Sequence, residues 1–521
     1  MVPVERLSHL PALARGLMTG SPDVSAFLPD RPTAAAIARR AEEVLAAFRK
    51  RDASTVDPNV LDLATGRRAG VFTGQQAGLF TGPLLALVKA LAAVQLAEDV
   101  TAKGTELSPV FWCATEDHDL VEVTRFVLPT AEGPRDLGPD PTSLGTNRHP
   151  VGSLPLGVDV DALLSAAVES LGQPADEEVL AALRASTVGK TFREAFVTTL
   201  AWLLSSTPLR TVDAARREDK RDLVPLAVRL VVEREKVRAI LLERAAALEA
   251  ASFPLQVTSD PSALPLFAVV DGERCLLVEA DGAFVLKGRS DERFAEADVV
   301  GRFESGEWLP SFSALTRPVA ASVLYPVAAT ILGPAEIAYW AQSLPLFAWA
   351  GVVPPVLVPR PLSAVVEAPV ARILGKLGLS LADALEGAES VVTRCGAAKT
   401  AAARERLASL RDAVDRGLGE ATPELVAIDA SLGKSIETTR GNVRFALDKL
   451  LERAAAAAGR ADETLKKQAA RLEEALVPNG QLAERVYTPV TYLLRHGRER
   501  LVEAIRRDVR WDRPGLQPVE L

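Results

Sequence analysis

The chain up to residue 130 alternates between helix-like and strand-like patterns of hydrophobic positions. Residues 33–50 place apolar side chains at helical spacing and predict an amphipathic helix. Residues 71–73 close a short apolar strand, and residues 83–98 form a helical run with Pro83 in its first turn, where proline is tolerated. Residues 108–114 are continuously apolar, as in a buried strand. Strand, helix and strand in this order predict a βαβ unit with a right-handed crossover.

The middle of the chain, residues 131–360, mixes the two kinds of pattern. Its Gly, Pro and Asn content predicts a loop over residues 132–150. Helical patterns cover residues 177–204 and 217–251.

Two further strand patterns follow in the same region. Residues 352–361 predict a buried strand that leads to Arg360. Residues 267–288 predict a β-meander, because strand-like runs flank two turn dipeptides, Asp271-Gly272 and Asp281-Gly282.

Residues 337–359 carry no formal charge and are long enough to span a membrane. Pro345, Pro354 and Pro355 interrupt the run, and a broken helix in lipid must find other partners for its freed backbone groups. We therefore expect buried strands and short helices here, and no membrane span.

The third region, residues 362–480, is rich in Ala, Leu, Glu, Lys and Arg and has almost no aromatic side chains. Apolar positions between residues 425 and 450 follow a 3–4 spacing, and residues 402–418 and 461–477 have the same character. This pattern predicts a helical hairpin or coiled coil. An ordinary helical bundle packed on the core and a dimerising coiled coil both fit it.

Composition narrows the class of protein. A chain of 521 residues is too long for one ordinary core, so two to four domains or one core with large insertions are expected. The net charge of −8 argues against a general binder of nucleic acid or anionic membranes. The three cysteines lie far apart and the N-terminal residues lack a continuous apolar run, so we expect a cytoplasmic protein without disulfides or a signal peptide.

The first candidate site is the glycine-rich stretch after residues 71–73. Thr73, Gly74, Gln75 and Gln76 lie between a strand and a helix, but they match neither a dinucleotide-binding nor a Walker loop. The glutamine amides and the backbone N–H groups of the turn are candidates for binding an anionic or sugar ligand. A surface turn with its amides in water is the alternative.

The second candidate site follows the strand at residues 108–114. Glu116, Asp117, His118 and Asp119 form a run of polar side chains before a helix that begins near Asp119. Ligands of open α/β sheets bind beyond the carboxyl ends of strands, so both stretches should share one edge of the sheet. Flanking carboxylates should raise the pKa of His118 and suit it to act as a general acid or base.

Other roles for these residues stay open. Asp119 also fits an N-cap. Zinc held by Cys113 and His118, or Mg²⁺ held by Asp117 or Asp119 with a nucleotide, is the metal alternative.

A third motif, LGPAEIAYW, spans residues 332–340 and includes Gly333, Pro334, Glu336 and Trp340. Its Gly-Pro start predicts a helix entry. Glu336 is the only charge between Arg317 and Arg360, and a carboxylate in so apolar a setting needs a partner. We expect one of these two arginines to pair with it. A structural ion pair and a substrate-binding group are both consistent with the pattern.

These motifs resemble a known family. TGQQAGLFTGP, FWCATEDHDLVEV, LGPAEIAYWAQ, VPR and PNGQLAERVY occur here in an order that is similar to that of the bacillithiol-biosynthesis cysteine-adding enzymes. The resemblance covers nearly the whole chain. It implies a Rossmann-like parallel-sheet core, similar to class I aminoacyl-tRNA synthetases and nucleotidylyltransferases. The expected domains are a core over residues 1–361 with insertions at about 131–345, a helical coiled coil over 362–480, and a C-terminal segment, 481–521, that packs back on the core.

The resemblance also implies a function. The family is thought to join cysteine to glucosaminyl-malate through an amide bond, the last step in making bacillithiol, and to form homodimers through the coiled coil. ATP with Mg²⁺ is then a candidate for activating the carboxylate, with no tightly bound metal; an acyl phosphate or a carrier ester fits as well. A metal-dependent hydrolase or nucleotidyl-transfer enzyme, and a non-catalytic helical scaffold, are the alternative classes.

The residues suggest roles within that reaction. His118, supported by Asp117 or Asp119, is the candidate base for the sugar amine. The substrate-binding candidates are Thr73, Gly74, Gln75, Gln76, Glu116, Gly333, Pro334, Glu336, Trp340, Arg317 and Arg360. Glu336 is expected to bind the cysteine ammonium, and Arg360 the malate carboxylates.

Overall fold

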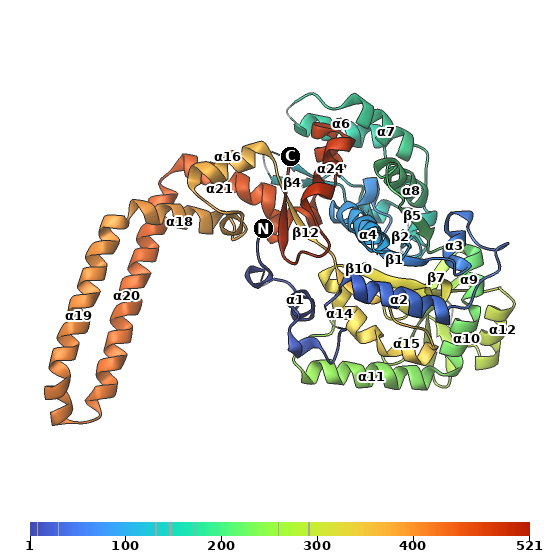
Figure 1. The fold of residues 1–521 in the computed structure, drawn as a ribbon, viewed down its shortest axis with the longest axis horizontal. Helices are drawn as coiled ribbons and strands as arrows, with labels where there is room; N and C mark the ends of the chain where they lie inside the picture. The colour runs from blue at the N-terminus through green and yellow to red at the C-terminus, as the bar shows by residue number, and fades with distance from the viewer. Residues whose placement is uncertain are drawn as a thin grey trace. The chain divides into compact units, whose positions relative to one another are not determined.

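The structure is a computed structural model that describes residues 1–7, 9–29, 31–130, 133–144, 148–171, 173–258, 260–289 and 292–521. The chain divides into two compact units, and Figure 1 traces both from the N-terminus to the C-terminus. Unit 1 comprises Met1–Ala364 together with Glu484–Leu521, and unit 2 comprises Val365–Ala483.

The core of unit 1 is a five-stranded parallel sheet with the strand order β11-β10-β1-β2-β5. β1, β2 and β5 follow one another in one direction across the sheet, whereas β10 and β11 are added on the other side of β1. The strand order therefore reverses between β1 and β10. This is a Rossmann-like arrangement, as predicted, and ligands of such sheets bind at the point of reversal. The strands are β1 (Ala69–Gln75), β2 (Leu107–Cys113), β5 (Arg210–Asp213), β10 (Val327–Leu332) and β11 (Val356–Pro359).

Two helices, α2 (Ala34–Ala47) and α4 (Leu85–Thr101), share one buried core with strands of this sheet. Ile37 and Val44 of α2 and Leu96 of α4 belong to it. Almost every side chain of α4 is buried, which explains its uniformly apolar sequence. The predicted βαβ succession of β1, α4 and β2 is confirmed.

The segment between β5 and β10 supplies a second sheet, antiparallel, with the order β8-β7-β6-β9. Asp271, Gly272, Asp281 and Gly282 all have positive φ, as the two tight hairpin turns require, so the predicted meander is confirmed. The strands are β6 (Ala263–Val270), β7 (Glu273–Ala280), β8 (Ala283–Leu286) and β9 (Leu309–Phe312).

Several helices precede this second sheet in the chain, and α9 and α10 pack against it. The helices predicted over residues 177–204 and 217–251 are confirmed, each divided into shorter helices. They are α7 (Glu177–Thr187), α8 (Phe192–Leu203), α9 (Arg217–Asp222), α10 (Val224–Val232) and α11 (Arg234–Ala250).

The loop predicted over residues 132–150 is partly wrong. β3 (Val127–Thr130) and β4 (Gly133–Asp136) form an antiparallel hairpin in which Pro129 is opposite Pro134. A two-stranded ribbon has free edges, so proline costs it no ladder hydrogen bond at such positions. Residues 132 and 145–147 of the predicted loop lie outside the described residues.

The uncharged run at residues 337–359 folds as predicted, into short helices and a strand. These are α14 (Pro334–Ser343), α15 (Pro345–Ala350) and β11. No helix in the described part of the chain is long and apolar enough to cross a membrane.

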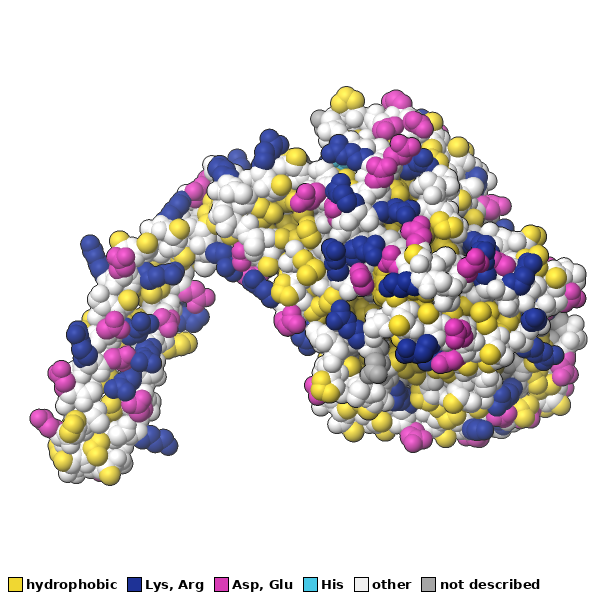
Figure 2. Space-filling model, viewed as in Figure 1, with side chains coloured by type: hydrophobic (Ala, Val, Ile, Leu, Met, Phe, Trp, Pro, Cys, Tyr) yellow, Lys and Arg dark blue, Asp and Glu magenta, His cyan; other side chains and the backbone are white. Residues whose placement is uncertain are grey.

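Unit 2 is helical. Its longest helices, α19 (Ala401–Ile428) and α20 (Leu432–Arg460), are joined by three residues and form the predicted helical hairpin. Both signs of charge are intermixed along the visible face of this hairpin (Figure 2). Gly396 of α18 (Ala388–Lys399) approaches the backbone of α20 so closely that a Cβ there would lie 2.1 Å from the Ala455 carbonyl oxygen. The fold class, a Rossmann-like core plus a helical coiled-coil region, is therefore confirmed.

Candidate functional site

Polar residues gather where the parallel strands of unit 1 end. β1 and β2 run in register, with Gln75 opposite Cys113, so TGQQ and the residues after β2 share one edge. β10 and β11 also end side by side, which adds Gly333 and Arg360 to this edge. The prediction that the two unusual stretches lie on the same edge of the sheet is confirmed. TGQQ borders the reversal point between β1 and β10, where a ligand is expected, and the residues after β2 lie one strand farther from it.

A buried lysine organises one part of this edge. Lys89 of α4 is 1% exposed, and its ammonium donates to the Gly74 carbonyl oxygen at 2.5 Å and contacts the Gln75 side-chain oxygen at 3.4 Å. It also forms an ion pair with Glu336 at 2.8 Å. The prediction that Arg317 or Arg360 would pair with Glu336 is therefore wrong. We define the Lys89 cluster as Lys89, Gln75, Glu122 and Glu336.

Glu336 has a second contact within its own helix. Gly333 is the N-cap of α14 and Pro334 occupies the first turn, while one oxygen of Glu336 accepts the Gly333 backbone N–H. A Cβ at residue 333 would lie 3.0 Å from that oxygen. Both contacts use Oε2, so Oε1 makes no hydrogen bond to any described residue.

Gln75 links Lys89 to a carboxylate that the sequence did not single out. Its amide donates to Glu122 Oε1 at 3.0 Å, and Glu122 belongs to α5 (Leu120–Thr124). Burial and the nearby carboxylates of Asp119, Asp117 and Glu336 raise the pKa of Glu122. Glu122 is thus a carboxylate prepared to hold a proton.

The turn that follows Gln75 is buried, and its backbone N–H groups bind carbonyl oxygens of the chain. Phe80 and Thr81 both have positive φ, a costly backbone conformation, and Phe80 packs on Phe126. The N–H groups of Gly78 and Gly82 donate to carbonyls inside the turn, and that of Leu84 donates to Tyr487 at 2.8 Å. These donors are not presented to a phosphate.

The remaining residues of this stretch differ in their exposure. Thr73 is buried on β1 and donates to the Ile331 carbonyl oxygen at 3.1 Å, which is a structural role. The side-chain oxygen of Gln76 is buried, and the described residues give it no hydrogen-bond partner.

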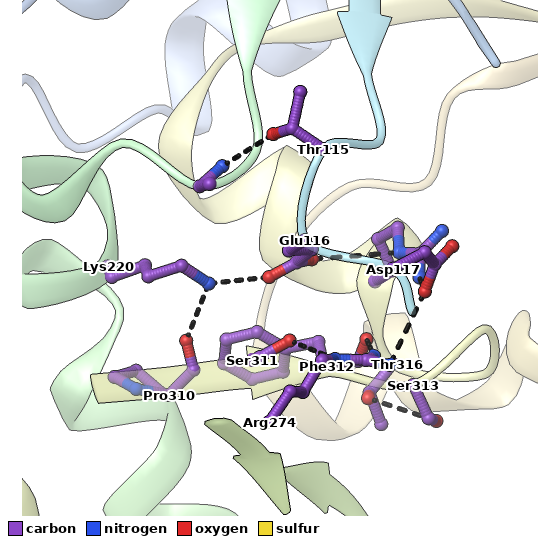
Figure 3. Close-up of polar contacts among 12 residues, drawn as sticks. Thr115, Glu116, Asp117, Lys220, Arg274, Pro310, Ser311, Phe312, Ser313 and Thr316 are labelled. Atoms are coloured by element: carbon purple, nitrogen blue, oxygen red, sulfur yellow. Dashed lines mark hydrogen bonds and ion pairs between the residues drawn. The ribbon is translucent and has the colours of Figure 1, made fainter. Parts of the chain in front are cut away.

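A second group of charges lies beyond β2. Glu116 is 3% exposed and pairs with Lys220 of α9 at 2.5 Å, while Asp117 pairs with Arg317 at 2.8 Å. Arg317 is the first residue of α13 (Arg317–Leu324). Figure 3 shows Lys220 approaching Glu116 from one side, with Asp117 on the other. The segment between β5 and β10 thus supplies the cations that neutralise the acidic run.

Arg274 of β7 completes this group. It is 5% exposed and lies 3.4 Å from Asp117 Oδ1, and its Nη1 donates to His118 Nδ1 at 2.9 Å. Burial would raise the pKa of Asp117, but Arg317 and Arg274 outweigh it and hold that pKa below its ordinary value. We define the Arg274 cluster as Glu116, Asp117, His118, Lys220, Arg274 and Arg317.

The electrostatics of His118 differ from the prediction. Burial and then Arg274 lower its pKa, and the opposing effect of Asp117 and Asp119 is smaller. The expectation that flanking carboxylates raise this pKa is therefore wrong. The reason is that Asp117 is bound by two arginines, while Asp119 is exposed and caps α5 by accepting the Glu122 N–H at 3.2 Å.

Two other predicted residues are turned to the interior. Trp340 is buried in the apolar core and stacks on Phe347. Arg360 is 2% exposed, and its guanidinium pairs with Glu484 at 2.6 Å and donates to the Pro361 carbonyl oxygen. Trp340 is therefore not presented to a ligand, whereas Nη2 of Arg360 is buried and has no hydrogen-bond partner among the described residues.

Arg485, the residue after Glu484, is exposed instead. The charges of Arg360, Glu484, Glu122 and Glu336 all act on it, so it lies near the Lys89 cluster. Burial of part of its side chain, followed by Arg360, lowers the pKa of its guanidinium.

Metal ligation has little support in the described residues. They include no group of three or more His, Cys, Asp and Glu side chains that could hold a metal ion. Glu116 and Asp117 are already paired with lysine and arginine. Cys113 is fully buried, and burial raises the pKa of its thiol, which disfavours the thiolate that zinc needs.

Five residues at this edge were not predicted from the sequence: Lys89, Glu122, Lys220, Arg274 and Arg485. Lys89 had a detectable signal, because it is the only charge in the apolar run at residues 84–97. Arg485 stands in the PNGQLAERVY motif. Lys220 and Arg274 had no local signal, because their partners are distant in sequence.

Comparisons with known proteins agree with this architecture. Residues 31–361 match the domain described as Bacillithiol biosynthesis BshC, N-terminal Rossmann-like domain. Residues 364–507 match the domain described as Bacillithiol biosynthesis BshC, C-terminal coiled-coil domain.

Relatives named "Putative cysteine ligase BshC" resemble most of the chain. The one from Koribacter versatilis is 33% identical over 440 residues, which cover 84% of this chain and 79% of the relative. The one from Thermus thermophilus is 32% identical over 487 residues, which cover 90% of this chain and 91% of the relative. The one from Symbiobacterium thermophilum is 29% identical over 480 residues, which cover 87% of this chain and 83% of the relative.

Proposed function

Because this chain belongs to the BshC family of bacillithiol biosynthesis, we propose that it is a ligase that joins cysteine to glucosaminyl-malate through an amide bond. The observation that carries this proposal is the pair of charge clusters at the carboxyl edge of the parallel sheet: the Lys89 cluster joins the ends of β1 and β10, where strand order reverses, and the Arg274 cluster lies beyond β2. Two small polar substrates need such opposed charges to be held side by side.

The Lys89 cluster is the proposed cysteine site. Glu336 keeps one carboxylate oxygen without a hydrogen bond from the described residues, and that oxygen can accept the α-ammonium of cysteine. The buried Lys89 fixes the other oxygen, so the carboxylate is held in one orientation.

Arg485 is the proposed contact for the malate carboxylates. The sequence placed Arg360 there, but its side chain is buried and its Nη1 already binds Glu484 and the Pro361 carbonyl oxygen. Arg485 is exposed and lies near the same cluster, and a guanidinium binds a carboxylate with two parallel hydrogen bonds.

The reaction needs one proton acceptor before the bond can form. The amino group of the sugar is an ammonium in water and attacks only after it loses a proton. Glu122, whose pKa is raised, is the proposed acceptor. The amine nitrogen then bonds to the carboxyl carbon of cysteine, the bond between that carbon and an activated oxygen breaks, and the departing oxygen takes the second proton of the nitrogen.

The activating group stays a prediction. ATP with Mg²⁺ was expected, but the glycine-rich turn does not fit a phosphate cradle, because its N–H groups at 78, 82 and 84 donate to carbonyls of the chain. We therefore assign no residue to ATP. An acyl phosphate and a carrier ester would both present cysteine with the leaving oxygen that the reaction requires.

Homodimerisation through unit 2 is part of the proposal. The hairpin carries large apolar side chains on its surface, which is a feature of surfaces that associate. These are Leu410, Val426, Ile428, Phe445 and Leu450. A reducing cytoplasm is the proposed location, because both cysteine and the product carry a free thiol.

Purified protein incubated with cysteine and glucosaminyl-malate, with and without ATP and Mg²⁺, tests the proposal. We expect a new species in the mass spectrum with the mass of both substrates less one water. Arg289→Met, which changes an arginine that pairs with Asp271 and Glu273 away from the site, is the control and should keep full activity. Absence of the product in both arms, and also with a thioester of cysteine, would overturn the proposal.

A further inference from the structure

We infer that His118 acts as a neutral hydrogen-bond donor through Nε2–H, and that Arg274 is the positioning residue that fixes this tautomer. The sequence suggested the opposite role, a proton acceptor supported by aspartate. The inference deepens the proposed function and, for the catalytic step, rests on it. The tautomer itself can be tested without any reaction.

Arg274 is held in one orientation from three directions. Its Nε donates to the Ser311 hydroxyl at 2.8 Å and its Nη2 donates to the Phe312 carbonyl oxygen at 3.2 Å, both on β9. Its guanidinium carbon lies 3.7 Å from the centre of the Phe267 ring. Figure 3 shows the side chain reaching from the second sheet to the residues that follow β2. Its third nitrogen, Nη1, is therefore aimed at His118.

The contact between Arg274 and His118 determines where the imidazole proton lies. A guanidinium is always protonated and can only donate, so His118 Nδ1, at 2.9 Å, must accept. A neutral imidazole carries one proton, which is then on Nε2. Burial and Arg274 lower the pKa of this ring, so the neutral form is the one present at neutral pH.

Asp117 does not act as the usual carboxylate partner of a catalytic histidine. Arg317 and Arg274 bind its Oδ1, and no carboxylate in the described residues hydrogen-bonds to either ring nitrogen of His118. A histidine that serves as a base normally donates Nδ1–H to such a group and keeps Nε2 free to accept. Here the arrangement is reversed, and Nε2 offers a proton.

A neutral donor has a clear use in amide formation. When the amine nitrogen attacks, the carboxyl C–N bond forms and the carbonyl oxygen becomes negatively charged. Nε2–H of His118 donates to that oxygen, which then re-forms its double bond and expels the oxygen of the activating phosphate or ester. Glu122 takes the proton that the sugar ammonium loses before the attack, the second N–H proton leaves with the expelled oxygen, and His118 keeps its own proton throughout. A donor of this kind contributes about 10²–10³ in rate.

Nuclear magnetic resonance of histidine labelled at both ring nitrogens tests the tautomer. The chain has four histidines, so the His118 signals can be assigned by their loss in His118→Gln. We expect a protonated Nε2 and an unprotonated Nδ1 at neutral pH. In Arg274→Met we expect a mixture of tautomers, while the control Arg289→Met leaves the signals unchanged. A protonated Nδ1, or an imidazolium, in the unmodified protein at neutral pH would overturn the inference, whether or not Arg274→Met folds.

Two substitutions at His118 test the role in catalysis. A glutamine amide N–H can stand in for Nε2–H but cannot take up a proton, whereas alanine offers neither. We expect His118→Gln to stay within about tenfold of the unmodified kcat, and His118→Ala to lose about 10²–10³. Equal losses in the two variants would overturn the donor role. If the unmodified protein shows no ligation, the proposed function fails, and the tautomer is still decided by the resonance experiment.

Discussion

The Arg274 cluster and the Lys89 cluster lie on one edge of the sheet but carry opposite charge. The first has three cations, Lys220, Arg274 and Arg317, against the carboxylates of Glu116 and Asp117. The second has two carboxylates, Glu122 and Glu336, against one lysine. Burial and then Arg274 lower the pKa of His118 in the first, and burial and then the nearby carboxylates raise the pKa of Glu122 in the second.

This difference assigns the roles of proton donor and proton acceptor to two residues, His118 and Glu122, whereas the sequence had suggested His118 for both. Opposite shifts in neighbouring titratable groups are the usual sign that one acts as donor and the other as acceptor. Burial and Arg274 favour the neutral form of His118, so it can donate without taking up a proton. The anion-rich cluster lets Glu122 hold the proton that the amine releases. Tyr339 lies between the clusters, since the charges of Glu336, Arg317 and Asp117 all act on it.

Each cluster contains a lysine that pairs with a glutamate, and the two glutamates differ in how deeply they are buried. Replacing Lys220 by methionine leaves Glu116, whose side chain is 4% exposed, with the Arg317 guanidinium at 3.8 Å as its remaining cation among the described residues. Losing one member of a buried pair costs about 3–5 kcal/mol. Lys89→Met should cost less, about 1–3 kcal/mol, because the Glu336 side chain is 29% exposed and can be rehydrated.

Urea unfolding followed by tryptophan fluorescence measures both losses. The six tryptophans all lie in unit 1, so the signal reports on the unit that contains both clusters. Equal losses for Lys220→Met and Lys89→Met would show that the two clusters do not differ in burial as described.

Glu122→Gln removes the proposed proton acceptor and keeps the shape of the side chain. We expect kcat for ligation to fall by about 10²–10³, a typical contribution of general base catalysis. In the unmodified enzyme the rate should fall as pH drops through the raised pKa of Glu122, because the protonated carboxyl cannot accept. That limb should be absent in Glu122→Gln. Glu106→Gln, at the opposite end of β2, is the control and should leave the profile unchanged.

The backbone of this site could be predicted from local patterns. The continuous apolar run at residues 108–114 and the apolar helix before it were sufficient for the βαβ unit. Because parallel strands end at the same edge of a sheet, this unit also predicted that TGQQ and TEDHD lie side by side. The turn dipeptides at 271–272 and 281–282 likewise encode their hairpins locally.

The pairing of charges could not be predicted in the same way. Arg274 and His118 are 156 residues apart, and Lys89 and Glu336 are 247 apart. Which cation reaches which carboxylate depends on how the segment between β5 and β10 packs against the strand ends. Glu336 was expected to pair with an arginine because the arginines are its nearest cations in the sequence, whereas its partner comes from the helix after β1.

A smaller effect is expected on the KM values, where Glu336 and Arg485 should each affect one substrate. Glu336→Gln weakens the proposed contact with the cysteine ammonium, and a hydrogen bond to a charged group contributes about 1.5–3 kcal/mol. We expect KM for cysteine to rise by roughly 10-fold or more, with KM for glucosaminyl-malate little changed. Arg485→Gln should have the reverse pattern. Steady-state kinetics with each substrate varied in turn distinguishes the two, and a rise of both constants in both variants would contradict the assignment.

The smallest effect is on the pH dependence of stability, and its sign differs between the clusters. The ordinary pKa of histidine is 6.5, and that of folded His118 is lower. Between these two values the unfolded chain binds more protons, so this residue makes stability fall as pH drops. For Glu122 the ordinary value is 4.5 and the folded value is higher. Between those values the folded chain binds more protons, so stability falls as pH rises.

Urea midpoints measured across both windows check these signs. Relative to His118→Gln, the unmodified protein should lose stability on acidification below 6.5. Relative to Glu122→Gln, it should lose stability as pH rises above 4.5. Each difference should be below about 1 kcal/mol, because both side chains are partly exposed and solvent screens their interactions. Slopes of the same sign in the two comparisons would contradict the opposite pKa shifts of His118 and Glu122, and the division between donor and acceptor would lose its electrostatic basis.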